Sequence, residues 1–294
     1  MQKALLLVNR HARRGKTALA EAIDLLKNLD LVLIEESTNH PRQLSNLIRS
    51  YQNQVDLVII GGGDGTLNAA IDGLIATKLP LGILPLGTAN DLARTLGIPT
   101  SLSEACQVIA KGQIKQIDVG RVNDKYFFNV ASLGLSVQIT QNLTKEAKRR
   151  WGVLAYAATT LRVIWQSRPF RAEILIPGET LRVRTIQIAI GNGRHYGGGM
   201  VVAEDAAIDD QRLDLYSLET KQWWQILALL PTMRQGNHAM LPGVRVLQGQ
   251  EIEIRTSKSR PINTDGEITT HTPAKFSVIP KALGVFVSPK SMQT

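Results

Sequence analysis

Residues 55–75 read VDLVIIGGGDGTLNAAIDGLI, and this stretch decides the fold of the chain. The apolar run at 55–60 predicts a buried strand, and the amphipathic run from Leu67 to Ile75 predicts a helix. Between them lies a turn that contains four glycines and Asp64. Successive glycines let the main chain approach a ligand closely and point several N–H groups at it, and the helix start adds the positive end of its dipole. The stretch therefore predicts a βα turn that binds phosphate groups through its backbone.

The carboxylate of Asp64 cannot itself bind phosphate, because like charges repel. It is suited instead to hold a divalent cation that accompanies the phosphates, or to orient the group that attacks them. An ordinary glycine-rich turn with a solvated aspartate is the alternative interpretation. Four glycines around one carboxylate at a strand exit favour the functional interpretation, which is a phosphoryl-transfer enzyme.

The composition is that of a folded protein with room for two domains. The chain has 294 residues, of which 44% are hydrophobic and 20% are charged. Its single cysteine, Cys106, rules out an internal disulfide and falls in a predicted helix, where a buried thiol is expected. The five histidines include no pair at the spacing of metal ligands. We therefore expect neither a disulfide-stabilised fold nor a histidine-based metal site.

Apolar run length and net charge limit the location and the partners. The N-terminus enters a strand directly, without a signal peptide, and no apolar run approaches the length of about 20 residues that a membrane span needs. We therefore expect a cytoplasmic protein. The net charge of +9 favours polyanionic partners such as nucleotides, nucleic acid or an anionic bilayer. Nucleic acid is not expected, because only 5% of residues are aromatic and no nucleic-acid-binding motif is present. The oligomeric state stays open.

Up to about residue 116, short apolar segments alternate with amphipathic ones, which predicts an α/β domain with a parallel sheet and helices on both faces. Ligands of such folds lie beyond the carboxyl ends of the strands. The glycine turn and a second turn, Pro85–Thr88, both fall there, so we expect them to converge on one site. The expected strands are Lys3–Val8, Leu31–Glu35, Asp56–Ile60 and Leu81–Leu84, and the expected helices are Thr17–Asn28, Pro41–Gln52, Leu67–Ala76, Asn90–Leu96 and Leu102–Ala110.

After Ile117 the chain becomes rich in strand patterns with period-two alternation, which predicts a mostly antiparallel β-sandwich. We expect a first domain at 1–117, whose completion by about 284–294 stays open, and a β-rich domain at 118–283, with the active site in the cleft between them. Helices are expected at Lys145–Trp165 and Gln222–Arg234. The expected strands are Ile117–Val122, Lys125–Ala131, Ala172–Ile176, Leu181–Ile190, Arg212–Ser217, Glu251–Arg255, Phe276–Ile279 and Val285–Val287.

Three further motifs follow the glycine turn in a fixed order. They are PLGTANDLAR at 85–94, the glycine-rich residues 191–200 that lead to Asp209-Asp210, and DGE at 265–267. Together they resemble the diacylglycerol-kinase-like lipid kinases, in particular the bacterial soluble branch related to sphingosine and ceramide kinases. The resemblance covers essentially the whole chain. The glycine turn alone is shared with nicotinamide-dinucleotide kinases and phosphofructokinases, so the ordered set carries the resemblance.

The resemblance implies ATP and Mg²⁺ as cofactors. Thr88 would contact ATP and Asp91 would organise the metal or the acceptor, although both residues and Asn90 also suit the capping of the following helix. The loop from Arg10 to Lys16 departs from the family pattern, and its ATP contacts stay open. It is not a Walker A loop, because Arg10 replaces the first glycine of that motif. The implied nucleotide-binding residues are Asn9, Thr38, Gly62, Gly63, Asp64, Gly65, Thr66, Leu67, Asn68, Gly87, Thr88, Asn90 and Asp91.

Asp265 and Glu267 are separated by one glycine, which would place both carboxylates on the same side of an extended segment. Such a pair suits proton abstraction from an alcohol, because one negative charge raises the proton affinity of the other. A polar hairpin turn is the alternative. The resemblance places the general base here, on Glu267 or Asp265, and the catalytic set becomes Glu267, Asp265 and Asp64.

The acidic pair Asp209-Asp210 resembles a structural magnesium site of the family. There the side chain of one aspartate, here Asp210, joins backbone carbonyl groups, here those of Ala207 and Arg212. Gln211 replaces the usual glycine after the pair. An acidic turn without metal is the alternative.

A basic cluster precedes an apolar stripe at helical spacing, an arrangement that could dock peripherally on anionic headgroups. The favoured interpretation is that the stripe packs on the sandwich and the charges are solvated, and Trp223-Trp224 raises the same question. The cluster comprises Lys145, Lys148, Arg149 and Arg150, and the stripe comprises Trp151, Leu154, Ala155, Ala158, Leu161 and Trp165.

These patterns together predict an ATP-dependent lipid kinase that transfers the γ-phosphate to the hydroxyl of a diacylglycerol-like acceptor. Residues 1–117 would bind the nucleotide, and residues 118–283 would bind the lipid. The sequence leaves the acceptor open among diacylglycerol, a sphingoid base, ceramide and phosphatidylglycerol. Two alternatives stay open as well, a dinucleotide kinase similar to NAD kinase and a non-catalytic nucleotide-binding regulatory protein.

Overall fold

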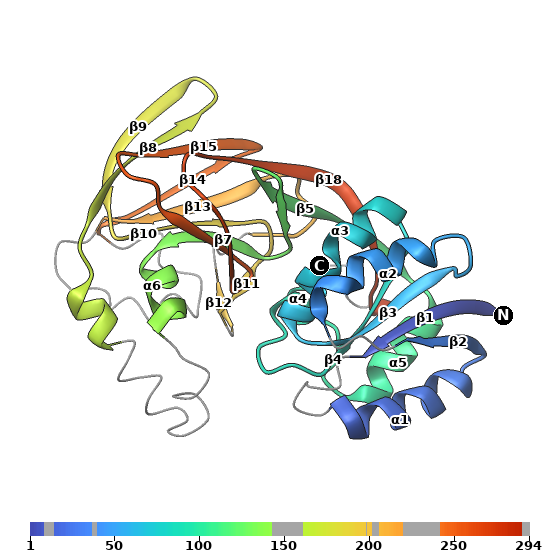
Figure 1. Ribbon diagram of the computed structural model, residues 1–294. Coiled ribbons are helices and arrows are strands. Elements are labelled where there is room, and N and C mark those ends of the chain that lie inside the picture. Colours follow the sequence, from blue (N-terminus) through green and yellow to red (C-terminus); the bar gives the residue numbers. More distant parts are fainter. Residues whose placement is uncertain are drawn as a thin grey trace.

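The structure is a computed structural model that describes residues 1–8, 15–36, 40–142, 161–197, 199–201, 206–219 and 242–289. Two domains lie side by side, an α/β domain from the N-terminal half and a β-rich domain (Figure 1). Within the described residues, no helix combines the length and the hydropathy that a membrane crossing requires.

The first domain contains a parallel sheet in the order β2-β1-β3-β4. Strands β1 and β3 are buried along almost their whole length because helices cover both faces of the sheet. The predicted strands and helices are confirmed, although α3 begins at Asp64 rather than Leu67. The elements are β1 Gln2–Val8, α1 Gly15–Lys27, β2 Leu31–Glu36, η1 Pro41–Gln43, α2 Leu44–Ser50, β3 Leu57–Gly62, α3 Asp64–Thr77, β4 Leu81–Pro85, α4 Asp91–Thr95 and α5 Leu102–Lys111.

The second domain is an antiparallel β-sandwich, as predicted. One layer is a six-stranded sheet in the order β14-β13-β10-β7-β16-β17, and the other layer contains β5, β6, β8, β9, β15 and β18. Apolar side chains from both layers form its core. The elements are β5 Ile114–Val122, β6 Lys125–Phe127, β7 Val130–Gly134, α6 Leu135–Asn142, β8 Phe170–Ile176, β9 Glu179–Thr185, β10 Gln187–Gly191, β11 His195–Tyr196, β12 Met200–Val201, β13 Leu213–Leu218, β14 Val244–Gly249, β15 Glu251–Thr256, β16 Pro261–Thr264, β17 Glu267–His271 and β18 Ala274–Phe286.

Strand β18 joins the two domains. It pairs with β5 and β15 in the sandwich, and its C-terminal end pairs in parallel with β4 of the first domain. Val285 and Phe286 belong to the core of the first domain. The prediction of two separate strands here was wrong, because β18 continues through a register shift at which Lys281 adopts a φ of 50°. The buried carboxylate of Asp118 holds this bulge by accepting the N–H of Lys281 at 2.7 Å.

Two other predicted strands were also wrong, because each is two strands that belong to different layers. The apolar run 125–131 divides into β6, which pairs with β5, and β7, which pairs with β10 and β16. The run 181–190 divides at Ile186 into β9, which pairs with β8, and β10. In each run, the strand before the break and the strand after it face the same apolar core. The hydrophobic pattern therefore does not show where the chain passes from one sheet to the other.

Candidate active site

The two βα turns of the first domain meet at the carboxyl ends of β3 and β4. The N–H of Leu86 donates to the carbonyl of Gly62 at 2.9 Å. Gly63 and Gly87 lie in backbone contact, since a β-carbon on Gly63 would lie 3.0 Å from Cα of Gly87 and one on Gly87 would overlap Gly63. Glycine is therefore required at both positions to bring the turns together.

Asn90 shapes the second turn. It adopts a φ of 50°, and its side-chain oxygen accepts the N–H of Gly87 at 3.0 Å while its amide donates to the carbonyl of Gly87 at 3.2 Å. The side chain of Asn90 is thus occupied by the turn itself. Thr88, at the tip of the turn, is exposed.

Two carboxylates lie close together where the turns meet. Asp64 accepts the N–H of Leu92 at 3.2 Å, which brings the start of α3 to the start of α4. Burial raises the pKa of Asp64, and the negative charge of Asp91, which is itself buried, raises it further. A cation between them would relieve this repulsion. Magnesium commonly binds to one or two carboxylates together with substrate phosphates, so this donor set fits a nucleotide-bound Mg²⁺.

Three residues after Gly65 have side chains that the protein itself engages. Thr66 is buried beneath Gly62, and Leu67 is 2% exposed within the core of the first domain. Asn68 donates its amide to the carbonyl of Thr264 at 3.1 Å, which ties α3 to β16 of the second domain. Among the predicted nucleotide ligands of this turn, the glycines and Asp64 are therefore the ones that can face a ligand.

Asp265 does not lie on an extended segment, so the predicted same-side placement of the two carboxylates was wrong. Asp265 and Gly266, with φ of 48° and 98°, form the two-residue turn of the β16–β17 hairpin. The carboxylate of Asp265 accepts the N–H groups of Phe128 at 2.7 Å and of Asn129 and Val130 at 3.0 Å. Burial raises the pKa of Asp265 to about 6, and the charge of Asp64 acts in the same direction. Asp265 thus anchors the link between β6 and β7.

Glu267 faces the glycine turn of the first domain. It begins β17 and is exposed. Its Oε1 lies 3.8 Å from the position that a β-carbon on Gly65 would take. The acidic side chains predicted from the two halves of the chain, Asp64 and Glu267, therefore come to the same junction of the domains.

A cluster that the sequence did not assign lies beside the second turn. His195 on β11 donates its backbone N–H to Oγ1 of Thr95 at 3.2 Å. The guanidinium group of Arg94 lies against Gly199, 3.2 Å from the position of its absent β-carbon. Burial lowers the pKa of His195, and the charges of Arg194 and Arg94 add to this effect. The glycine-rich motif at 191–200 was the available signal, because it implied that this segment closely approaches another part of the protein.

Two of the residues predicted to hold a structural magnesium ion contact each other, and the magnesium site stays a prediction. Oδ2 of Asp210 lies 2.9 Å from Nε of Arg212, and Oδ1 accepts the N–H of Arg212 at 3.2 Å. Burial raises the pKa of Asp210, whereas the Arg212 contacts and the N–H of Ala207 lower it. The guanidinium group of Arg212 thus lies at ion-pair distance from Asp210, but Oδ2 of Asp210 accepts no hydrogen bond from the described residues, and Ala207 presents an N–H to the carboxylate. The described part of the chain contains no cluster of three or more histidine, cysteine, aspartate or glutamate side chains suited to a metal.

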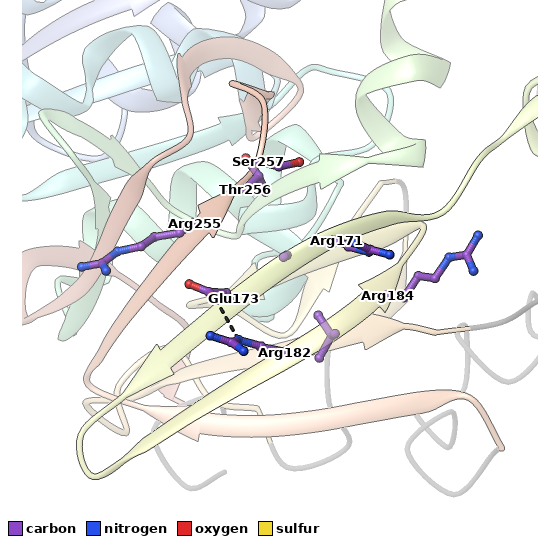
Figure 2. Close-up of a pocket in the computed structure, with 9 residues that line it drawn as sticks. Arg171, Glu173, Arg182, Arg184, Arg255, Thr256 and Ser257 are labelled. Atoms are coloured by element: carbon purple, nitrogen blue, oxygen red, sulfur yellow. Dashed lines mark hydrogen bonds and ion pairs between the residues drawn. The ribbon is translucent and has the colours of Figure 1, made fainter.

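Asn9 and Thr38 lie outside the described residues, as do residues 10–14 of the loop before α1. Two surface depressions, each of about 640 Å³, lie on the outer face of the sandwich. One is lined by arginines of β8, β9 and β15, where Arg182 pairs with Glu173 (Figure 2). Neither depression contains a residue of the site described above.

A parallel-sheet domain with a glycine turn, joined to a sandwich that supplies carboxylates, defines a kinase-like class of protein. The family model "Diacylglycerol kinase catalytic domain" matches residues 3–122, and "YegS C-terminal NAD kinase beta sandwich-like domain" matches residues 129–287. The chain therefore belongs to the YegS-like lipid kinase family, which confirms the resemblance seen in the motifs. Membership of a kinase family implies the use of ATP.

Individual proteins agree with this assignment. The chain is 30% identical to "Putative lipid kinase SH2167" of Staphylococcus haemolyticus, over 83% of this chain and 80% of that one. It is 34% identical to "Probable lipid kinase YegS-like" of Chromohalobacter salexigens, over 77% and 74% of the two chains. A crystal structure titled "a putative diacylglycerol kinase from Bacillus anthracis str. Sterne" matches with a TM-score of 0.85 and 26% identity, over 99% of this chain and 96% of that chain.

Proposed function

We propose that the protein transfers the γ-phosphate of ATP to a hydroxyl group of a lipid, with diacylglycerol as the representative acceptor. The observation that carries this proposal is the position of Glu267, whose Oε1 lies 3.8 Å from the β-carbon position of Gly65. A carboxylate of the second domain thus faces the phosphate-binding turn of the first. Phosphoryl transfer requires that the acceptor oxygen and the phosphate meet in line, and two facing domains are suited to this.

The first domain would bind the nucleotide. At the start of α3 the N–H of Thr66 donates to the carbonyl of Gly63 at 2.9 Å, whereas the N–H of Gly65 has no acceptor among the described residues and is available to a phosphate oxygen. Asp64 and Asp91 would hold Mg²⁺, which when bound supplies positive charge to the phosphates. Thr88 at the exposed tip of the second turn is available for a contact with the nucleotide.

Glu267 would act as the proton acceptor. It is exposed, and no hydrogen bond links it to another described residue. The proton of the lipid hydroxyl would move to the Glu267 carboxylate as the hydroxyl oxygen attacks the γ-phosphate. Asp265 is a positioning residue instead, because three backbone N–H groups already engage its two oxygens. A positioned base typically contributes a factor of about 10²–10⁴ to the rate.

A dinucleotide kinase is the second candidate. The glycine turn is common to both kinds of kinase, and the matched description of the second domain is a "NAD kinase beta sandwich-like domain". The names of the relatives favour a lipid acceptor over a dinucleotide.

Labelled ATP separates these candidates. The protein is incubated with Mg²⁺ and either total lipid extract, diacylglycerol in detergent micelles, or NAD, and the labelled product is identified by mass spectrometry. We expect labelled lipid, a loss of about 10²-fold or more in Glu267→Gln, and no change in the control Glu251→Gln, an exposed glutamate on β15. Labelled NAD phosphate would establish the dinucleotide kinase, and nucleotide binding without any labelled product would establish a regulatory protein.

A further inference from the structure

Two large apolar side chains are exposed on the helical residues 161–166 of the second domain. Residues 161–166 are helical and precede β8 in the chain. Val163 and Ile164 are buried in an apolar cluster on the outer side of the six-stranded sheet. Leu161 and Trp165 are 48% and 69% exposed. Because they are four residues apart, they share one face of the helix.

The described end of the apolar stripe does not pack on the sandwich. Leu161 and Trp165 face solvent, whereas the other members of the stripe and the basic cluster at 145–150 lie outside the described residues. The helix is held on the sandwich by Val163 and Ile164, which lie on its other side. Leu161 and Trp165 are therefore exposed although the helical residues 161–166 are packed on the sandwich.

Two arginines without an ion-pair partner in the described part of the chain lie near Leu161 and Trp165 in sequence. Arg162 and Arg168 are exposed, and neither forms an ion pair with any residue in the described ranges. On the outer face of β8, β9 and β15, Arg182 pairs with Glu173 at 3.0 Å and Arg255 pairs with Glu253 at 2.7 Å, whereas Arg171 and Arg184 form no ion pair with the described residues. The Arg182–Glu173 pair is drawn in Figure 2.

We propose that the 161–168 surface, formed by Leu161, Arg162, Trp165 and Arg168, docks on an anionic phospholipid bilayer. Tryptophan is suited to the headgroup level of a bilayer, because its ring is apolar and its N–H needs a polar partner. Arginine binds the phosphates of the headgroups, and the chain as a whole carries a net charge of +9. The proposal rests on the proposed function in that a lipid kinase must reach an acceptor held in a bilayer.

The docking surface and the proposed proton acceptor are carried by the same sheet. Leu135 of α6 belongs to the apolar cluster that holds Val163 and Ile164. The side chain of Thr140, also on α6, accepts the amide of Asn263 on β16 at 3.2 Å. Strand β16 leads through the Asp265 turn to Glu267. Docking through this surface would therefore fix the orientation of the site relative to the membrane.

Vesicle co-sedimentation of the full chain tests the proposal. The probes are vesicles of phosphatidylcholine alone and of phosphatidylcholine mixed with phosphatidylglycerol. We expect binding to the mixed vesicles that weakens as salt concentration rises. The double variant Arg162→Gln/Arg168→Gln should bind about tenfold or more weakly, since each surface cation contributes about 1 kcal/mol. The variant Trp165→Ser should lose binding as well.

Matched variants show whether the effect is local. Arg182→Gln/Arg255→Gln removes the same charge from ion-paired arginines, and Val32→Ser removes an apolar side chain that is 40% exposed on the first domain. Both should bind as the unmodified protein does. An equal loss in Arg182→Gln/Arg255→Gln would overturn the proposal in favour of a general charge effect.

Two further measurements separate the remaining outcomes. If Trp165→Ser abolishes self-association in sedimentation equilibrium and leaves vesicle binding unchanged, the surface binds a second copy of the chain and the proposal is overturned. Phosphorylation of lipid in detergent micelles distinguishes the two proposals. Normal activity on micelles with reduced activity on vesicles in the 161–168 variants supports docking. Vesicle binding that depends on this surface, in a protein that phosphorylates no lipid, supports docking and overturns only the proposed kinase activity.

Discussion

Gly65 leaves open the space into which Glu267 points. A β-carbon at Gly65 would lie 3.8 Å from Oε1 of Glu267, so an added methyl group would make ordinary contact with the carboxylate and clash with nothing else within that distance. This is the place where, under the proposed mechanism, the acceptor hydroxyl has to lie. The packing around Gly65 therefore permits a methyl group there, but that group would occupy the space that the acceptor hydroxyl needs.

The variant Gly65→Ala should therefore affect stability and activity differently. Because Gly65 lies in the first turn of α3, alanine should raise the free energy of unfolding by up to about 1 kcal/mol. At the same time kcat/KM should fall about 10²-fold, since displacement of a reactant by about 1 Å has an effect of this size. Urea denaturation and steady-state kinetics measure the two effects. Gly249→Ala, where a β-carbon also meets only ordinary contacts, should leave activity unchanged. Full activity in Gly65→Ala would show that the acceptor does not lie there.

Asp265 should make stability depend on pH. Its pKa is raised to about 6, chiefly by burial, so the folded protein binds this proton more tightly than the unfolded chain does. The stabilising contribution is therefore present below about pH 4 and is lost as pH rises through 6. Relative to Asp265→Asn, the unmodified protein should lose up to about 3 kcal/mol of unfolding free energy between pH 4 and 7. Asp124→Asn provides a control of opposite sign, because Lys125 lowers the pKa of Asp124. A difference that does not vary with pH would contradict the assignment.

The first domain could be predicted well because its signals are local. A buried parallel strand such as β3 appears as one apolar run, and α5 appears as one amphipathic run. The sandwich could be predicted as a class but not strand by strand. Ile186 separates two strands that pair in different layers, yet it is as apolar as its neighbours. The bulge at Lys281 depends on the side chain of Asp118, which is distant in sequence.

The candidate site divides in the same way. Gly63, Asp64 and Gly87 could be identified because close backbone approach and phosphate binding require particular residue types in short motifs. The difference between Asp265 and Glu267 could not be predicted, because it depends on three N–H groups at 128–130 that reach only Asp265. The contact of the Arg212 guanidinium group with Asp210 was not predicted either, because the resemblance assigned only the backbone carbonyl of Arg212 to this site.

Asp64→Asn should raise stability and abolish activity together. Burial and the charge of Asp91 both raise the pKa of Asp64, so its ionised form destabilises the folded protein at neutral pH. Asparagine keeps an oxygen for the N–H of Leu92 without the charge. The melting temperature should therefore rise at pH 7 but not below the ordinary pKa of an aspartate, where the carboxyl group is uncharged in both the folded and the unfolded chain. Activity should fall about 10²-fold or more, because Asp64 would no longer hold the Mg²⁺ ion that supplies positive charge to the phosphates.

The matched control for this variant is Asp72→Asn, which removes an exposed carboxylate from the same helix. It should change neither the melting temperature at pH 7 nor the rate. A lower melting temperature in Asp64→Asn would show that this carboxylate stabilises the fold, which is the opposite of the repulsion inferred from its surroundings.

The pairing of Asp210 with Arg212 predicts that stability does not depend on magnesium. Because the guanidinium group lies 2.9 Å from the carboxylate, EDTA should leave the melting temperature of the nucleotide-free protein unchanged. The variant Arg212→Gln should lower the free energy of unfolding by up to about 1 kcal/mol, the usual contribution of a partly exposed ion pair. Arg255→Gln removes an arginine from an exposed pair and should have a smaller effect. One magnesium ion per chain after exhaustive dialysis, with a melting temperature that falls on chelation, would show that the cation rather than Arg212 neutralises Asp210.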